Sequence, residues 1–228
     1  MPFFFFDPTM ILLIPAFILA VWAQIKVKTT YNKFKKIAAA NGMRGAEVAR
    51  YILQKNGIYD VEVEPVPGEL SDHYDPRVKK VRLSEYNYAS NSLSAIAVAA
   101  HEVGHAIQHA HGYMPLKLRH AILPVTNFAS YAAFPLFFIG FLFNGGILMQ
   151  LGIIFFAAVV LFHVVTLPVE FNASWRALNQ LRSSGLLMET EVTAARKVLT
   201  AAALTYVAAA AMALLELLRL IILANSRD

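Results

Sequence analysis

The sequence predicts a mainly α-helical integral membrane protein, with four transmembrane helices and a small α+β portion at the cytoplasmic face. Three observations support this fold class. Hydrophobic residues make up 57% of the 228-residue chain, which is more than a soluble domain usually contains. Four runs are long and apolar enough to cross a bilayer as helices. One long polar stretch, residues 27–120, leaves room for a folded portion outside the lipid.

The first span is expected at Pro8–Ile25, within a first segment of residues 1–26. Only Asp7 is charged ahead of it, whereas a secretory signal peptide has its basic residues first. Because basic residues stay on the cytoplasmic side of a membrane, the N-terminus is expected outside and the next segment inside. Five lysines follow the span: Lys26, Lys28, Lys33, Lys35 and Lys36.

Residues 27–120 are expected to contain helices and strands. Thr29–Ala40 is basic and amphipathic, which is typical of a helix that lies on a lipid surface. A second helix is predicted at Gly42–Lys55, where apolar residues can form one packed face. An apolar period of two then predicts strands at Val61–Val66 and Val78–Leu83, with turn residues between them.

After this stretch, apolar spans alternate with basic segments. Residues 121–169 are expected to form a hairpin of two spans, whose turn carries no Lys or Arg. The four basic residues within 170–197 return the chain to the cytoplasmic side, and 198–228 hold the fourth span and the tail. Both termini are then outside. Glu216 and Arg219 stand three residues apart in the fourth span and are expected to form an ion pair.

A further helix is predicted at Tyr88–Gln108, and it contains the pattern H-E-x-x-H as His101, Glu102 and His105. The two histidines stand one turn apart on one helix face, so both imidazoles can bind one ion. Glu102 is rotated away from them but can reach a water beside the metal. The neighbouring positions are small or apolar, which argues against a merely solvated helix face. The pattern indicates a zinc hydrolase, with the histidines as ligands and Glu102 as general base.

A catalytic zinc site usually has a third protein ligand and one open position. His111 has the spacing of the metzincin motif, but that motif requires glycine where this chain has Gln108. His109 is two turns beyond the first histidine, too far along a continuous helix to share the ion. Glu170 ends a long apolar run, where a carboxylate is costly unless it is paired or metal-bound. Glu170 is therefore the expected ligand, and the alternative is that it caps the next helix or pairs with Arg176.

A zinc peptidase also needs a donor for the oxyanion that develops on the substrate carbonyl. His73 and Tyr74 are the preferred candidates for oxyanion or substrate contacts, although their segment could be only a turn network built by Asp72 and Asp75. Lys79–Leu83 is the candidate strand for pairing with a substrate backbone, and the alternative is an ordinary hairpin edge. The other candidate donors are Tyr113, Arg119, His120 and Arg176.

His163 lies within the third span, seven residues before Glu170 and therefore on the same helix face. Histidines inside membrane spans are functional candidates. We expect His163 either to support the metal ligands from behind or to hydrogen-bond Asn127 or Thr166.

The stretches Ala100–Gln108 (AHEVGHAIQ) and Leu167–Ser174 (LPVEFNAS) resemble the YugP-like family of neutral zinc metallopeptidases, and the resemblance extends over nearly the whole chain. It implies a bacterial multi-pass membrane protein whose zinc is bound by the two histidines and Glu170. The arrangement is also similar to membrane gluzincins of the HtpX type, which implies a zincin-like cytoplasmic portion. Where this chain has Asn172 the family often has Asp, which implies a role for Asn172 behind a histidine ligand, without charge.

These observations predict a membrane-embedded zinc metallopeptidase that hydrolyses peptide bonds with a zinc-activated water. The alternatives are a zinc-binding membrane scaffold without turnover and a zinc hydrolase of a non-peptide bond. The expected partners are a peptide or membrane-protein substrate and the lipid bilayer, and a homo-oligomer or a membrane adaptor is compatible with such a chain. The absence of cysteine excludes disulfides and Cys-based zinc sites. The net charge is +5, and the basic residues cluster beside the apolar segments. This pattern indicates membrane topology rather than nucleic-acid binding.

Overall fold

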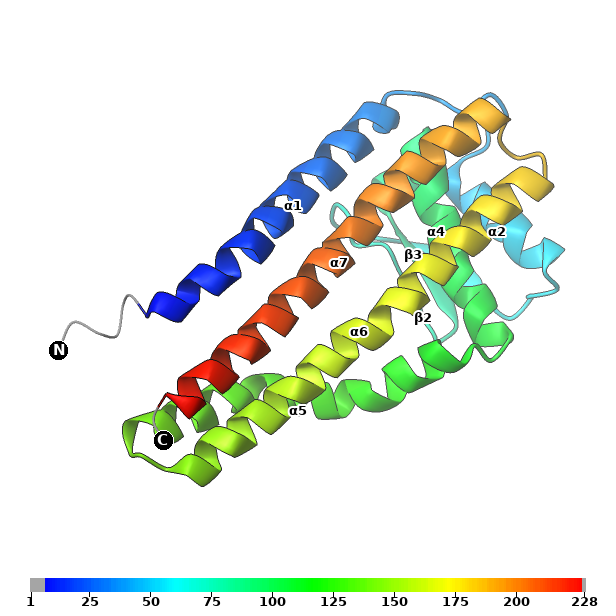
Figure 1. Cartoon of the computed structure of the whole chain (residues 1–228). Coiled ribbons are helices and arrows are strands. Elements are labelled where there is room, and N and C mark those ends of the chain that lie inside the picture. The colour runs from blue at the N-terminus through cyan, green and yellow to red at the C-terminus, as the bar shows by residue number, and fades with distance from the viewer. Residues whose placement is uncertain (1–6, 227–228) are drawn as a thin grey trace. The chain divides into compact units, whose positions relative to one another are not determined.

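A computed structural model describes residues 7–226, so the ends of the first and last predicted segments, 1–6 and 227–228, lie outside the described residues. The fold is mainly helical with one small sheet, as predicted (Figure 1). A short 3-10 helix, η1 (Pro8–Leu13), leads into α1 (Ile14–Lys35). The elements that follow are α2 (Gly45–Lys55), β1 (Glu62–Val66), β2 (His73–Asp75), β3 (Lys80–Ser84), α3 (Glu85–Ala89), α4 (Leu93–Ala110), α5 (Met114–Leu142), α6 (Gly146–Ser183) and α7 (Glu189–Asn225).

Four helices of the described chain are long and apolar enough to cross a membrane, as predicted. Their bounds differ from the predicted spans, because a helix can continue where hydropathy changes. The predicted surface helix at Thr29–Ala40 is wrong as a separate element, since α1 runs on to Lys35 without a break. The candidate spans are Pro8–Phe34, Met114–Leu142, Gly146–Ser183 and Glu189–Asn225.

The chain divides into two compact units. The first unit comprises Met1–Gln24, Leu118–Leu167 and Thr205–Asp228, and the second comprises Ile25–Lys117 and Pro168–Leu204. The described part of the first unit contains helices but no strand, whereas the second unit contains the sheet and the H-E-x-x-H helix. Helices α1, α5, α6 and α7 each contribute residues to both units.

Aromatic and small residues form the core of the first unit. Ala133 and Phe137 of α5 are buried together with Phe156 of α6. A Cβ atom at Gly152 would lie 2.7 Å from the backbone nitrogen of Phe137, so glycine permits this close approach of α5 and α6. Tyr131 on the outer surface is 82% exposed, as suits a side chain that faces lipid rather than water.

The ion pair expected in the fourth span is present in the first unit. Arg219 Nη1 donates to Glu216 Oε1 at 2.9 Å, and Arg219 Nη2 donates to Asp7 Oδ2 at 3.2 Å. Two carboxylates thus surround one guanidinium, which lowers the cost of holding these charges in an apolar helix bundle.

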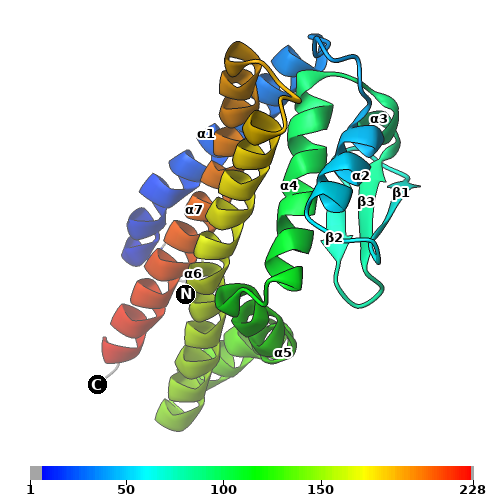
Figure 2. The same ribbon diagram turned by 90° about the vertical axis from the view of Figure 1, so that its right-hand side faces the viewer.

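Helix α4 is the centre of the second unit. Its N-cap is Ser92, whose hydroxyl accepts a hydrogen bond from the backbone N–H of Ala95 at 3.2 Å. Buried Ile96 and Ile107 of α4 belong to one core cluster with Ile52 of α2 and Val81 of β3. Figure 2 shows α2 and the sheet on the same side of α4.

The sheet has the order β1-β3-β2, with β1 parallel and β2 antiparallel to β3. The sequence predicts only two strands, because β2 lies in a segment whose residues are typical of turns. Since β3 (Lys80–Ser84) pairs on both sides, the prediction that Lys79–Leu83 binds a substrate backbone is wrong. Strand β2 occupies one edge of the sheet instead.

Candidate metal centre

Close backbone packing joins α4 to the second half of α6 at the H-E-x-x-H motif. A Cβ atom at Gly104 would lie 2.5 Å from the carbonyl oxygen of Ala173, closer than any side chain allows. Glycine between the two motif histidines therefore permits α4 to lie directly against α6. This contact brings α4 to the level of Glu170, which lies about one turn before Ala173 on α6.

The ligand atoms of His101, His105 and Glu170 all lie within 4.8 Å of one another. Glu170 Oε2 is 3.3 Å from His101 Nε2 and 3.6 Å from His105 Nε2. Two ligands about 2.0–2.1 Å from a tetrahedral zinc ion stand roughly 3.3 Å apart. The two distances from the carboxylate are close to this value, and the donor set of two imidazoles and one carboxylate suits a zinc ion.

Each motif histidine has a hydrogen-bond partner on its other ring nitrogen. His105 Nδ1 lies 3.0 Å from Gln108 Oε1, and His101 Nδ1 lies 3.1 Å from Ser174 Oγ. An amide oxygen can only accept, so His105 Nδ1 carries the proton and Nε2 keeps its lone pair for a metal. The Ser174 hydroxyl can accept from His101 Nδ1 in the same way.

Gln108 links the histidine to α6 through its amide nitrogen. This side chain is fully buried, and its Nε2 donates to the carbonyl oxygen of Val169 at 2.8 Å and to Asn172 Oδ1 at 3.1 Å. Asn172 Oδ1 also accepts from Arg176 Nε at 2.7 Å. Asn172 thus contacts Gln108, which bonds His105, and its predicted role behind a histidine ligand stays a prediction.

The Glu102 carboxyl is only 8% exposed. Burial raises its pKa to about 7, while a hydrogen bond from the backbone N–H of Tyr74 and the charge of His101 act in the opposite direction. A carboxyl group whose pKa lies near neutrality is suited to both accepting and releasing a proton. The Tyr74 amide also places β2 beside Glu102.

The side chains of His73 and Tyr74 are engaged elsewhere. His73 is exposed, with Nδ1 2.8 Å from the carbonyl oxygen of Ser71. The Tyr74 hydroxyl lies 2.8 Å from His109 Nδ1. Turn contacts hold the same segment: Asp72 Oδ1 accepts from the backbone N–H of Ser84 at 2.8 Å, and Asp75 accepts from Arg77. The alternative of a turn network is therefore present, and an oxyanion role for either side chain stays a prediction.

The remaining histidines lie outside the three-residue cluster. His111 is the C-cap of α4 and its Nδ1 lies 3.3 Å from Arg176 Nη1, so the structure brings Glu170 rather than His111 to the imidazoles. His163 belongs to the first unit, where its ring contacts that of Phe162. The hydroxyl of Thr166, one partner considered for His163, donates to the Phe162 carbonyl. Support of the metal ligands by His163 stays a prediction.

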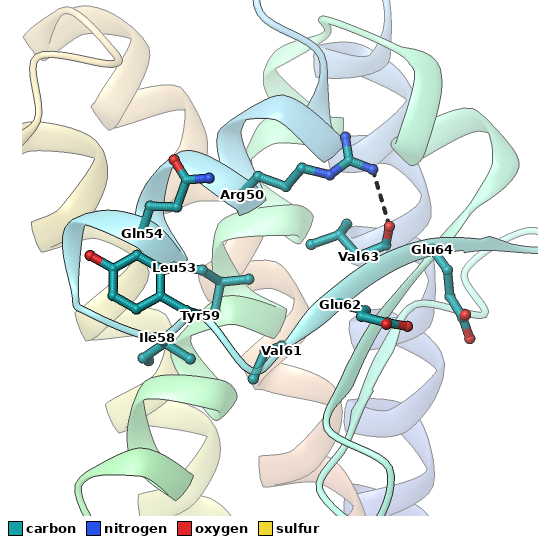
Figure 3. Close-up of a pocket in the computed structure, with 9 residues that line it drawn as sticks. All are labelled: Arg50, Leu53, Gln54, Ile58, Tyr59, Val61, Glu62, Val63 and Glu64. Carbon is teal, nitrogen blue, oxygen red and sulfur yellow. Dashed lines mark hydrogen bonds between the residues drawn. The ribbon is translucent and has the colours of Figure 1, made fainter.

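Two pockets of similar size lie on the sheet side of the second unit. One, of about 370 Å³, is formed by α2 and β1 (Figure 3), where Arg50 Nη2 donates to the Val63 carbonyl. It is lined by none of the three clustered residues, so it is not part of the metal centre. The other, of about 380 Å³, is lined by Tyr74 and His109, among others. It borders the strand that reaches Glu102.

Sequence reasoning missed Gln108 and Ser174 as hydrogen-bond partners of the motif histidines. Helical spacing could have indicated both residues. Gln108 is three residues after His105, and Ser174 is four residues after Glu170, so each shares a helix face with a ligand. A polar side chain at such a position within an apolar helix is a candidate partner for an imidazole.

Comparison with known proteins agrees with this geometry. Residues 9–225 match the family described as "Putative neutral zinc metallopeptidase". The chain is also 55% identical over 219 residues to the "Putative membrane protease YugP" of Bacillus subtilis, covering 95% of this chain and 97% of that protein. No solved structure was found to match the chain. By the extent of both matches, the chain belongs to this family of neutral zinc metallopeptidases.

Proposed function

We propose that the protein is a membrane-embedded zinc endopeptidase in which His101, His105 and Glu170 hold the ion and Glu102 is the general base. The observation that carries this proposal is the convergence of three ligand atoms within 4.8 Å beside a buried carboxyl group. The family supports zinc and peptide-bond hydrolysis in general terms. A scaffold that binds zinc only for stability would have no use for Glu102 in this position.

His101, His105 and Glu170 would hold the zinc ion, which would supply Lewis acidity toward a peptide carbonyl and the attacking water. Glu102 accepts the proton that water loses as its oxygen attacks the carbonyl carbon. The same carboxyl then donates this proton to the amine nitrogen as the C–N bond breaks. Gln108 and Ser174 hold the imidazole rings in the tautomer that binds metal.

The substrate backbone is proposed to bind along β2. Among the described residues, β2 pairs only with β3, and a backbone hydrogen bond joins Tyr74 of β2 to Glu102. A peptide that adds to this edge as a further strand would pass beside the proposed general base. Backbone pairing of this kind recognises an extended peptide with little dependence on its side chains.

The centre is proposed to face the cytoplasm, with both termini outside. The lysines that follow the first span and the basic residues of 170–197 support this orientation through the positive-inside rule. The three proposed ligands lie in the unit that contains both of these basic segments.

The test is the Glu102→Gln variant, assayed in liposomes with fluorescein-labelled casein. We expect the rate constant for hydrolysis to fall by about 10²–10⁴-fold, the usual contribution of general acid–base catalysis. The zinc content should stay that of the wild type, because Glu102 is not a proposed ligand. The matched control is Glu85→Gln, which changes an exposed glutamate at the start of α3. Wild-type hydrolysis by Glu102→Gln would show that Glu102 is not the base.

A further inference from the structure

A basic pocket lies between α1 and the beginning of α7, within the second unit. Its volume is about 580 Å³, the largest among the pockets described here. Lys26 and Lys33 line it from α1, and Arg196 and Lys197 line it from α7. The lining contains no Asp or Glu. The pocket therefore presents four positive charges to a single volume.

The lining residues lie on matching faces of the two helices. On α1 the two lysines are seven residues apart, with Thr30 between them, which is the spacing of one helix face. On α7 the basic pair is followed one turn later by Thr200. Hydroxyl groups thus lie between the cations, and they can donate hydrogen bonds to an anion.

Acidic residues near the pocket are occupied by other partners. Glu191 accepts hydrogen bonds from the backbone N–H groups of Ala40 at 2.8 Å and Met188 at 2.9 Å. Glu189 pairs with Arg182 at 2.6 Å, and the more distant charge of Arg196 has a smaller influence on its pKa. Among the described residues, none of the four pocket cations makes an ion pair. Their charge is therefore available to a ligand.

The pocket also has an apolar wall at the ends of two candidate spans. Phe34, Ala201 and Leu204 line it beside the cations. Lys26 and Lys33 lie in the last third of the span Pro8–Phe34, and the α7 residues lie in the first half of Glu189–Asn225. Cations and apolar side chains meet in this way where a helix passes from the hydrocarbon to the lipid headgroups.

We propose that this pocket binds the headgroup of an anionic phospholipid, with the phosphate between the two pairs of cations. The four charges and the hydroxyls match a phosphodiester, and the apolar wall matches the glycerol and the first acyl carbons. Basic pockets between membrane helices at the cytoplasmic side commonly take phospholipid headgroups in this manner. The site is separate from the metal centre, because none of its lining residues belongs to the His101, Glu102, His105 and Glu170 group.

The test compares two double variants with the same change in charge. Lys33→Gln/Arg196→Gln removes one cation from each wall of the pocket. Lys28→Gln/Lys36→Gln removes two exposed cations from the same basic region, neither of which lines the pocket. The measurement is native mass spectrometry of the purified protein, titrated with phosphatidylglycerol or with phosphatidylcholine in detergent.

The wild type and the Lys28/Lys36 control should retain phosphatidylglycerol in preference to phosphatidylcholine. In the Lys33/Arg196 variant this preference should weaken roughly 30-fold, about five-fold for each basic residue lost near a lipid headgroup. An equal loss in both double variants would mean diffuse attraction to the lipid surface, and it would overturn the proposal. Displacement of phosphatidylglycerol by millimolar inorganic phosphate would also overturn it, in favour of a free phosphate as ligand. Zinc content in each sample checks that the fold is intact.

Discussion

The half of α6 before Pro168 and the half after it bury different kinds of side chain. In the first half, Phe156 and Val160 pack into an apolar core, and Gly152 permits close contact with α5. In the second half, Glu170 approaches two imidazoles and Ser174 bonds one of them. The two halves are one continuous helix, so backbone conformation does not distinguish them. The difference lies in the polar groups that the facing helix supplies.

This comparison explains how a buried carboxylate is tolerated in the second half. Glu170 is 2% exposed, and both motif histidines lie within 3.6 Å of its Oε2 atom. A polar group without such neighbours is costly in an apolar environment. The first half has an apolar neighbour in α5 and carries no Asp or Glu, in agreement with this rule.

The largest effect is expected when the Glu170 carboxylate is removed from the second half of α6. Glu170→Ala is expected to lower zinc affinity by more than the roughly 10–100-fold that loss of an outer partner costs, because a direct ligand is lost. The measurement is zinc content after dialysis against a buffered chelator. His111→Ala is the matched control, since it removes a histidine that has the metzincin spacing but lies outside the cluster. Full zinc in the Glu170 variant and loss in the His111 variant would reverse the assignment.

The next largest effect on zinc affinity is expected from the hydrogen bonds by which Gln108 joins His105 to α6. Gln108→Ala removes the partner of His105 Nδ1 and the donor to Val169. Zinc affinity should fall about 10–100-fold. Gln108→Glu keeps an oxygen acceptor for His105 and should recover part of the affinity, whereas a purely structural role would show no such rescue. The visible absorption spectrum of the cobalt-substituted protein, where its d–d bands lie, would report the change in coordination directly.

Close backbone packing should give a smaller effect, on stability, in both halves of α6. Gly104→Ala forces a Cβ against Ala173, and Gly152→Ala forces one against Phe137. Each should lower stability by about 1–3 kcal/mol, the usual cost of overpacking. Only Gly104→Ala should also weaken zinc binding, because only that contact aligns proposed ligands. Gly146→Ala, where a Cβ meets nothing within 4 Å, should have little effect in thermal unfolding. Equal zinc affinity in all three variants would argue against a role of this contact in alignment.

The smallest effect is expected outside α6, in β2, and it depends on pH. Hydrogen bonds from Arg77 lower the pKa of Asp75 from 3.8 to about 2. A carboxyl group with a lowered pKa stabilises the fold above its ordinary pKa, and this contribution is lost as pH falls from about 4 to about 2. Asp75→Asn should therefore lower the melting temperature at pH 6 but not at pH 2. A difference of equal size at both pH values would assign the effect to packing instead.

Much of the fold and of the centre could be predicted from sequence, and particular residues show why. His101, Glu102 and His105 follow from local helical spacing, and the four apolar helices follow from length and composition. Glu170 lies far from them in sequence, and it was predicted because an acid at the end of an apolar run needs a partner. Each of these features could be predicted from helical spacing, hydropathy or the cost of burying a charge.

The parts that sequence missed depend on contacts between distant segments. Strand β2 is only three residues long and is held by pairing with β3, so no periodic pattern could reveal it. The central position of β3 likewise results from parallel pairing with β1, which the sequence does not encode locally. Gln108 shares a helix face with a motif histidine, but its bond to Val169 needs α6 beside α4. Tertiary pairing, rather than intrinsic propensity, decided these features.

The continuity of α6 has a consequence for where cleavage can occur. At 1.5 Å per residue, Glu170 stands about 36 Å along the helix from Gly146, and a hydrocarbon layer is about 30 Å thick. On the proposed function, a span that begins at Gly146 would carry the proposed ligand Glu170 a short distance beyond the acyl chains. Peptide bonds held at that depth, next to a membrane boundary, are those that such a centre would reach first.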